Sequence, residues 1–334
     1  MSEARYPDTA TTRDRLILSL RPPRATHDPW QAHGVTAELE PDASGSLVDV
    51  ITVFLTGREC PWRCAMCDLW QYTTDADTPG GALPHQIRDA LGGRVPGGHA
   101  WHVKLYNAGS FFDPHAVPPS DYKAIARAIR GAARVVVESH PSLVGPRVDD
   151  WLEALNEASP SGPTALEVGM GLETAHPGAL ERLNKRMTTE SFAEAASELR
   201  RRFVAMRAFV LVSPPFVPAV EQAEWLVRSV DFAFECGATA VSLIPTRGGN
   251  GAMGALMAEG LFTRPTLDMV ESAMDAALAR ARGRVFVDLW ELDHLASCDA
   301  CYAGRRSRLA AMNLVQRPAP RVLCPSCAPV ESHA

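Results

Sequence analysis

The sequence predicts an α/β fold: an incomplete (β/α)6 TIM-like barrel with a small Cys-rich C-terminal module. The first observation is an alternation within residues 47–290, where six apolar runs are each followed by a helical stretch, which is typical of a parallel sheet. The second is that this alternation stops at residue 291, where a Cys-rich tail begins. Since eight strand–helix units form a complete barrel, six units indicate an incomplete one.

The expected elements follow in chain order. Strands are expected at the short apolar or β-branched runs 48–56, 101–106, 134–138, 164–169, 205–212 and 239–244, with one more at 285–289. Helices are expected at residues 85–91, 120–130, 147–158, 191–202, 220–236 and 267–282. The glycine-rich segment 248–251, after the sixth strand, is expected to form a flexible loop over the barrel mouth.

We therefore expect three parts. Residues 1–46 are rich in Pro and Asp, have weak periodicity, and are predicted to be an N-terminal arm. Residues 47–290 are predicted to form the partial barrel, and residues 291–334 a four-cysteine metal-binding module. Pro318 and Pro320 argue against one long helix in this module, because proline interrupts the helical hydrogen-bond ladder.

Composition excludes several classes of protein. Of the 334 residues, 46% are hydrophobic and 22% are charged, which is ordinary for a globular protein and unlike a disordered chain or a fibre. No run approaches the ~18 apolar residues of a membrane helix, and the N-terminus lacks the apolar core of a signal peptide. We expect no membrane association and a cytoplasmic location, where thiols stay reduced.

The charge is unevenly distributed. The net charge is −6, yet residues 302–330 contain five arginines and no acidic residue; the arginines are at 305, 306, 308, 317 and 321. A small module with clustered arginines can contact the phosphates of RNA. It can equally be a solvated loop or dock on the acidic barrel, and the sequence leaves these alternatives open.

Three of the eight cysteines follow the first predicted strand. Cys60, Cys64 and Cys67 have the spacing C-x3-C-x2-C, with no fourth Cys or His in the local loop. A [4Fe–4S] cube held by three cysteines leaves one iron open to an external ligand. The loop also lies at the carboxyl end of a strand, where α/β barrels place their chemistry. A zinc site with a distant fourth ligand, or buried thiols without metal, are the alternatives.

Four further cysteines form two C-x2-C pairs in the tail, Cys298 with Cys301 and Cys324 with Cys327. Four thiolates close a tetrahedral site, and paired C-x2-C knuckles favour structural zinc. The same four can hold an auxiliary [4Fe–4S] cluster. Cys236, at the end of a predicted helix, is expected to be a buried thiol.

The cysteine loop resembles that of the radical S-adenosylmethionine superfamily. Further segments carry the resemblance: Asn-Ala-Gly-Ser-Phe-Phe-Asp at 107–113, Glu-Ser-His-Pro at 138–141 and Gly-Leu-Glu-Thr at 171–174. They are similar to the elongator-subunit-like and methylthiotransferase-like branch, and to the small group that includes the radical enzyme of archaeosine synthesis. His140 stands where that branch has Arg, and Ser110 replaces an acidic residue.

The resemblance implies a function. Cys60, Cys64 and Cys67 would bind a [4Fe–4S] cluster whose open iron chelates S-adenosylmethionine, which is cleaved reductively to a radical that takes a hydrogen atom from the substrate. It implies cofactor contacts at six positions, Met66, Gly109, Ser110, Glu138, Glu167 and Glu173. Glu167 and Glu173 can instead be solvated carboxylates, and Lys185 and Arg186 either pair with the cofactor carboxylate or form a basic helix face. No residue acting on the substrate is assigned.

The partners implied are a reductant, such as flavodoxin or ferredoxin, and a substrate that is left open between a modified tRNA base and a small metabolite or peptide. The competing hypothesis is a non-enzymatic protein that holds zinc or another metal and binds RNA or a protein partner through its basic C-terminal module.

Overall fold

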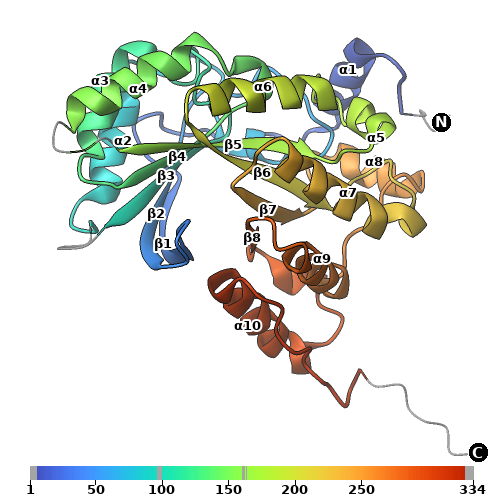
Figure 1. The fold of residues 1–334 in the computed structure, drawn as a ribbon. Coiled ribbons are helices and arrows are strands. Elements are labelled where there is room, and N and C mark those ends of the chain that lie inside the picture. The colour runs from blue at the N-terminus through green and yellow to red at the C-terminus, as the bar shows by residue number, and fades with distance from the viewer. Residues whose placement is uncertain (1–5, 96–99, 160–161, 163, 328–334) are drawn as a thin grey trace, which may run out of the picture.

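The structure, a computed structural model, describes residues 6–95, 100–159, 162 and 164–327. Its centre is one eight-stranded sheet in chain order, curled into a half-barrel (Figure 1). The strands are β1 (Gly34–Pro41), β2 (Leu47–Leu55), β3 (Trp101–Asn107), β4 (Arg134–Glu138), β5 (Ala165–Glu173), β6 (Ala205–Val212), β7 (Ala240–Pro245) and β8 (Arg284–Val287). β1 pairs antiparallel with β2, and every later pair is parallel.

Ten α-helices are described, of which α2 to α9 connect the parallel strands on the outer side of the sheet (Figure 1). They are α1 (Ala10–Leu20), α2 (Ala82–Leu91), α3 (Tyr122–Ala128), α4 (Pro146–Ala158), α5 (Pro177–Arg182), α6 (Thr189–Arg201), α7 (Gln222–Glu235), α8 (Ala252–Ala258), α9 (Leu267–Ala279) and α10 (Asp299–Val315). Strand residues that face these helices, such as Val53, Leu105 and Val137, are fully buried. The face toward the helices is therefore apolar, while the inner face also carries buried charged residues such as Lys104, Glu167 and Arg207.

The fold prediction is confirmed: the structure is an α/β half-barrel with a Cys-rich C-terminal end. The seven predicted strands correspond to β2–β8, and the six predicted helices to α2, α3, α4, α6, α7 and α9. Within the described chain, no helix is both long and apolar enough to cross a membrane.

Several elements were not predicted. The segment 1–46 contains α1 and β1, and the short helices α5 and α8 lie within predicted loops. The tail contains α10, a 17-residue helix that ends at Val315, so Pro318 and Pro320 follow the helix instead of preventing it. α10 lies beside β1 and β8, on the open side of the half-barrel.

Candidate functional site

The loop that carries Cys60, Cys64 and Cys67 leaves the carboxyl end of β2. All three thiols are free and their residues are half-buried. Burial raises the pKa of Cys60 to about 12 and that of Cys67 to about 11, and it raises the pKa of Cys64 well above its ordinary value. These thiols are therefore protonated on their own, and they become thiolates when a metal supplies compensating positive charge.

Two buried asparagines hold the main chain of this loop. Asn184, which follows α5, donates from Nδ2 to the Arg63 carbonyl at 2.7 Å. Asn250, which follows β7, donates from Nδ2 to the Cys64 carbonyl at 2.9 Å. Both side chains come from segments more than 100 residues away, so they fix the loop on the barrel.

The glycine-rich segment 248–251 follows β7 as a loop, as expected, and it packs against the cysteine loop. Asn250 is fully buried. Gly249 has φ +66°, and a Cβ there would lie 3.2 Å from the Met66 carbonyl oxygen and 2.7 Å from Cγ of Met253. Only glycine fits this close approach. Met66 is one of the predicted cofactor contacts, and this packing of Gly249 fixes its main chain.

At the end of β3, a buried carboxamide lies beside Gly109. Asn107 is 4% exposed, and neither its Oδ1 nor its Nδ2 has a hydrogen-bond partner within the described residues. A Cβ at Gly109 would come within 3.2 Å of the Asn107 Nδ2 and 3.3 Å of the Arg58 carbonyl oxygen. Buried carboxamides are rarely left unpaired, so this one is available to a ligand.

Ser110 has a different environment from Asn107. Its hydroxyl is buried and accepts a hydrogen bond from the His140 N–H at 2.5 Å, which ties the end of β3 to the end of β4. The His140 ring stacks on Trp62, inside the cysteine loop, with ring centroids 3.7 Å apart. Burial, aided by the Lys185 charge, lowers the pKa of His140 to about 4, so the ring is neutral. Its Nδ1 accepts from the Ser142 N–H, so Nε2 donates to the Lys185 carbonyl at 2.9 Å.

Three charged residues gather at the ends of β4 and β5. The Lys185 ammonium donates to the Gly171 carbonyl at 2.6 Å and pairs with the Glu173 carboxylate. Burial lowers the pKa of Lys185, but Glu173 and Cys64 outweigh burial and the pKa is raised overall. Burial raises the pKa of Glu138 to about 8, although Lys185 opposes this. Nowhere in the described chain does the Glu138 carboxylate find a hydrogen-bond donor.

Glu167 lies elsewhere. It is the third residue of β5, near the amino end of the strand and not at its carboxyl end as the sequence interpretation assumed. Its fully buried carboxylate pairs with Arg207 at 2.8 Å, and with Arg284 and Arg134 at 3.2 and 3.4 Å. These pairs belong to an ion-pair cluster inside the barrel. The Glu167 carboxylate is therefore bound by arginines and not by a cofactor.

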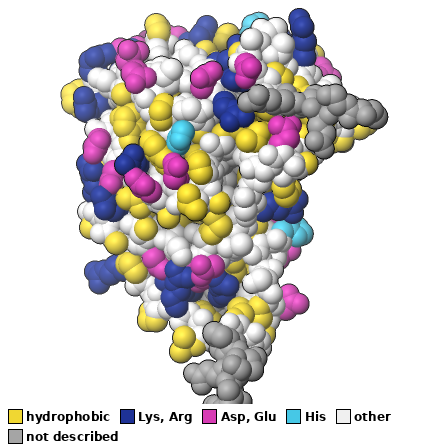
Figure 2. Space-filling model, turned by 90° about the vertical axis from the view of Figure 1, so that its right-hand side faces the viewer, with side chains coloured by type: hydrophobic (Ala, Val, Ile, Leu, Met, Phe, Trp, Pro, Cys, Tyr) yellow, Lys and Arg dark blue, Asp and Glu magenta, His cyan; other side chains and the backbone are white. Residues whose placement is uncertain are grey.

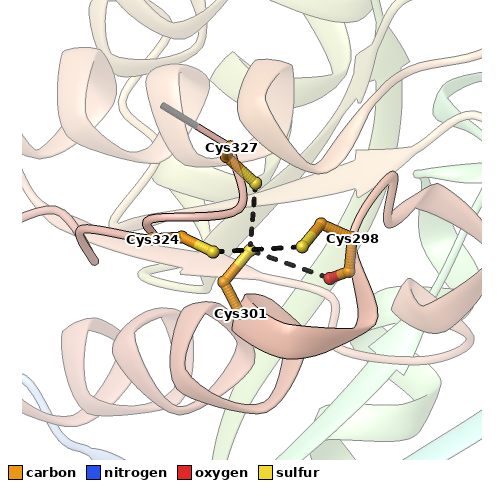
Figure 3. Close-up of side chains that lie close together, drawn as sticks. All are labelled: Cys298, Cys301, Cys324 and Cys327. Atoms are coloured by element: carbon orange, nitrogen blue, oxygen red, sulfur yellow. Dashed lines mark hydrogen bonds between the residues drawn. The ribbon is translucent and has the colours of Figure 1, made fainter. Parts of the chain in front are cut away.

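The four tail cysteines converge (Figure 3). Their sulfur atoms all lie within 4.8 Å of one another, with 3.9 Å between Cys298 and Cys324 and 3.7 Å between Cys301 and Cys327. Bonds of about 2.3 Å to a tetrahedral zinc ion would place sulfurs about 3.8 Å apart. A cubane cluster spreads its ligand sulfurs more widely, so the separation fits a single ion.

The arginines near the tail site mostly dock it on α9. Arg305 pairs with Glu271 at 2.6 Å, Arg308 with Asp275 at 2.6 Å, and Arg321 with Asp268 at 2.8 Å. On the face drawn in Figure 2, basic side chains lie among acidic ones. Docking on the acidic barrel, one of the alternatives left open, is thus observed for three of the five arginines. Arg306 and Arg317 are exposed, and neither has an ion-pair partner among the residues described.

No family model matches the chain. Over 203 residues, the chain is 25% identical to the archaeosine synthase subunit beta of Methanosarcina acetivorans. This match covers 57% of this chain and 56% of the relative. This similarity and the C-x3-C-x2-C loop at the end of the first parallel strand of a half-barrel agree with the resemblance to the radical S-adenosylmethionine superfamily.

Further matches were found. An uncharacterised protein of Methanocaldococcus jannaschii is 25% identical over 147 residues, which cover 43% of this chain and 39% of that protein. Among solved structures, the Elp3 of Methanocaldococcus infernus is 12% identical with a TM-score of 0.48, covering 71% of this chain and 56% of that one. Methylornithine synthase is 12% identical with a TM-score of 0.45, covering 80% and 83%. The chain spans about half or less of the length of the curated relatives it matches.

The residues present fit the groups that this superfamily carries. Three thiols in one fixed loop suit a cluster with an open iron. The unpartnered Asn107 carboxamide beside Gly109, and the Glu138 carboxyl without a donor, can take the amino and carboxylate groups of S-adenosylmethionine. Sequence reasoning missed Asn107, Asn184 and Asn250, although Asn107 begins a segment that carried the resemblance.

Proposed function

We propose that the chain is a radical S-adenosylmethionine enzyme whose cysteines Cys60, Cys64 and Cys67 bind a [4Fe–4S] cluster. The observation that carries the proposal is the three-thiol loop, fixed at the carboxyl end of β2 by Asn184 and Asn250. When bound, the cluster and S-adenosylmethionine supply the 5′-deoxyadenosyl radical that removes a hydrogen atom from the substrate.

Residues of this chain would bind the cofactor and order the site. Asn107, Gly109, Glu138 and the Met66 main chain would hold S-adenosylmethionine. Ser110 supports the site through His140, while the pair of Glu173 with Lys185 supplies fixed charge beside the cluster loop. Glu167 is left out of the proposed set, since its carboxylate is bound by arginines.

We propose that Cys298, Cys301, Cys324 and Cys327 bind one zinc ion. The support is the spacing of the sulfurs, which suits a single tetrahedral ion better than an auxiliary [4Fe–4S] cluster. The ion would join the start of α10 to the segment after it. Its role is then structural, because four thiolates leave no open position.

Two kinds of partner are proposed for the reaction. Reductive cleavage needs an electron donor, such as flavodoxin or ferredoxin. The substrate is proposed to be a modified base of tRNA, for which the support is the name of the archaeosine synthase relative; as a subunit, that relative also suggests a partner chain. Of the basic segment, Arg306 and Arg317 remain free to contact RNA phosphates.

The experiment is reductive cleavage after anaerobic reconstitution. Protein incubated with dithionite and S-adenosylmethionine is expected to form 5′-deoxyadenosine, detected by mass spectrometry. Cys64→Ala should abolish product formation and cluster binding while zinc is retained. Cys236→Ala, the control, should keep both the product and the cluster. Two zinc ions and no iron in the wild-type protein would instead favour a non-enzymatic protein that binds RNA or another partner.

A further inference from the structure

A cavity of about 350 Å³ lies at the carboxyl ends of β7 and β8. We define the β7–β8 pocket by its lining residues, Pro245, Thr246, Arg247, Gly248, Arg264, Trp290, Glu291, His294 and Leu295. Cavities of roughly 300–1,000 Å³ accept small ligands, and α/β barrels place their chemistry at this end of the strands.

The pocket shares a wall with the cofactor loop. Residues 246–248 line it, and the next residue, Gly249, packs against the main chain of Ala65 and Met66 in the cysteine loop. A ligand in the pocket therefore lies next to the segment that packs against the cysteine loop. Asn107 and Glu138, the proposed cofactor contacts, come from β3 and β4 on another part of the sheet.

One wall of the pocket is pre-organised by Asp288. Its carboxylate accepts a hydrogen bond from the main-chain N–H of Trp290 at 3.0 Å and pairs with the Arg247 guanidinium. The next residue, Glu291, has φ +54°, an uncommon conformation for a residue with a side chain. The turn holds the Trp290 indole with 58% of its surface exposed, although an indole gains free energy when it is covered.

The two guanidinium groups of the pocket differ. Arg247 is committed to Asp288 and lies 3.8 Å from Glu291. Arg264, in the segment between α8 and α9, is exposed and is offered no carboxylate in the part of the chain that the structure describes. A free guanidinium binds carboxylate or phosphate through two parallel hydrogen bonds.

We propose that the β7–β8 pocket binds the substrate through a planar ring stacked on Trp290 and an anionic group held by Arg264. This inference rests on the proposed function, because it assigns the pocket to the molecule that the radical attacks. The chemistry fits two sources, a nucleotide or a free aromatic acid.

The test is calorimetric titration of the reconstituted protein without reductant. The probes are guanosine 5′-monophosphate, guanosine and indole-3-carboxylate. Arg264→Gln is expected to weaken binding of the two anions about tenfold, equal to about 1.4 kcal/mol, and to leave guanosine unchanged. Trp290→Ala should weaken all three probes. The controls are Arg130→Gln and Trp30→Phe, both at exposed positions outside the pocket, and neither should change any affinity.

The two anionic probes distinguish a nucleotide from a free aromatic acid. Tighter binding of guanosine 5′-monophosphate indicates a nucleotide, tighter binding of indole-3-carboxylate indicates an aromatic acid, and either result supports the proposal. The proposal is overturned if no probe binds at millimolar concentration, if both pocket variants bind like wild type, or if S-adenosylmethionine displaces the probe. Because the titration involves no electron transfer, its failure is separate from a failure to form 5′-deoxyadenosine.

Discussion

Asn313 of α10 exchanges two hydrogen bonds with Val287 at the free edge of β8. Its Oδ1 accepts from the Val287 N–H at 2.8 Å, and its Nδ2 donates to the Val287 carbonyl at 2.9 Å. Gln316, three residues later, does the same with Val285 at 2.7 and 2.8 Å. Two side-chain amides thus satisfy the edge of the sheet as a ninth strand would, and the C-terminal helix protects that edge.

Replacing Asn313 should expose that edge. Asn313→Ala is expected to lower the free energy of unfolding by about 1–3 kcal/mol, because a buried N–H and carbonyl lose their partners. Urea unfolding followed by circular dichroism measures this. Ser307→Ala, at an exposed position of the same helix, is the control and should change little. Equal stabilities of the two variants would show that the amide pairs do not secure the edge.

Removing the tail metal should loosen the same edge, because the four cysteines join both ends of the segment that contains α10. A chelator is expected to release one zinc ion per chain. Hydrogen exchange at the Val285 and Val287 amides should then accelerate, while exchange in β4 stays slow. Cys301→Ser should behave like chelated protein. If exchange at Val285 and Val287 is unchanged after complete zinc loss, the metal does not stabilise the edge of β8.

Gly249→Ala should disturb the cysteine loop. A left-handed backbone costs a residue with a side chain about 1–2 kcal/mol, and the new Cβ would meet Met253 and the Met66 carbonyl. We expect iron to leave the reconstituted variant about tenfold faster in the presence of a chelator, for a cost near 1.4 kcal/mol. Gly254→Ala is the control: a Cβ there has nothing within 4 Å, and it lies within α8. Equal rates of iron loss from the two variants would show that packing at Gly249 does not fix the cysteine loop.

The buried ion-pair cluster should make stability depend on acid pH. Burial would raise the pKa values of Glu40 and Glu167, but Arg207 with Lys104 at Glu40, and Arg207 with Arg284 at Glu167, outweigh it and lower both to about 2. Because these folded-state values lie below the ordinary value of 4.5, their stabilisation is complete above pH 4.5. It is lost as pH falls from 4.5 through 2.

Glu167→Gln tests this assignment. At neutral pH it is expected to cost about 3–5 kcal/mol, since three arginines lose their buried partner. Its unfolding free energy should also fall less steeply below pH 4.5 than that of wild type. Glu153→Gln, at an exposed position of α4, is the control. A variant with the same acid slope as wild type would show that Glu167 does not carry this dependence.

Local pattern explains how much of the fold could be predicted. The parallel strands could be found because each contains a short run of apolar or β-branched residues, as in residues 50–53. β1 could not: it is an edge strand whose buried Glu40 is paired with Lys104 and Arg207, partners that lie 64 and 167 residues away. Likewise, the polar residues of α10 are used by α9 and the β8 edge, which no local signal indicates.

The same division applies to the site. The cysteine spacings are local, so both groups were identified from sequence. Asn250 acts on a carbonyl 186 residues away, and a buried asparagine has no pattern that reveals its target. Glu167 and Glu173 both had to be considered from sequence, and only their positions along β5 separate a structural carboxylate from one beside the cluster loop.

The central claim is that three cysteines hold a cluster with an iron open to S-adenosylmethionine. The most direct measurement is the electron paramagnetic resonance spectrum of the anaerobically reconstituted, dithionite-reduced protein, recorded with and without S-adenosylmethionine. We predict a [4Fe–4S]+ signal that shifts when S-adenosylmethionine is added and is absent from Cys64→Ala. A signal that S-adenosylmethionine leaves unchanged, or one that persists in Cys64→Ala, would contradict the account.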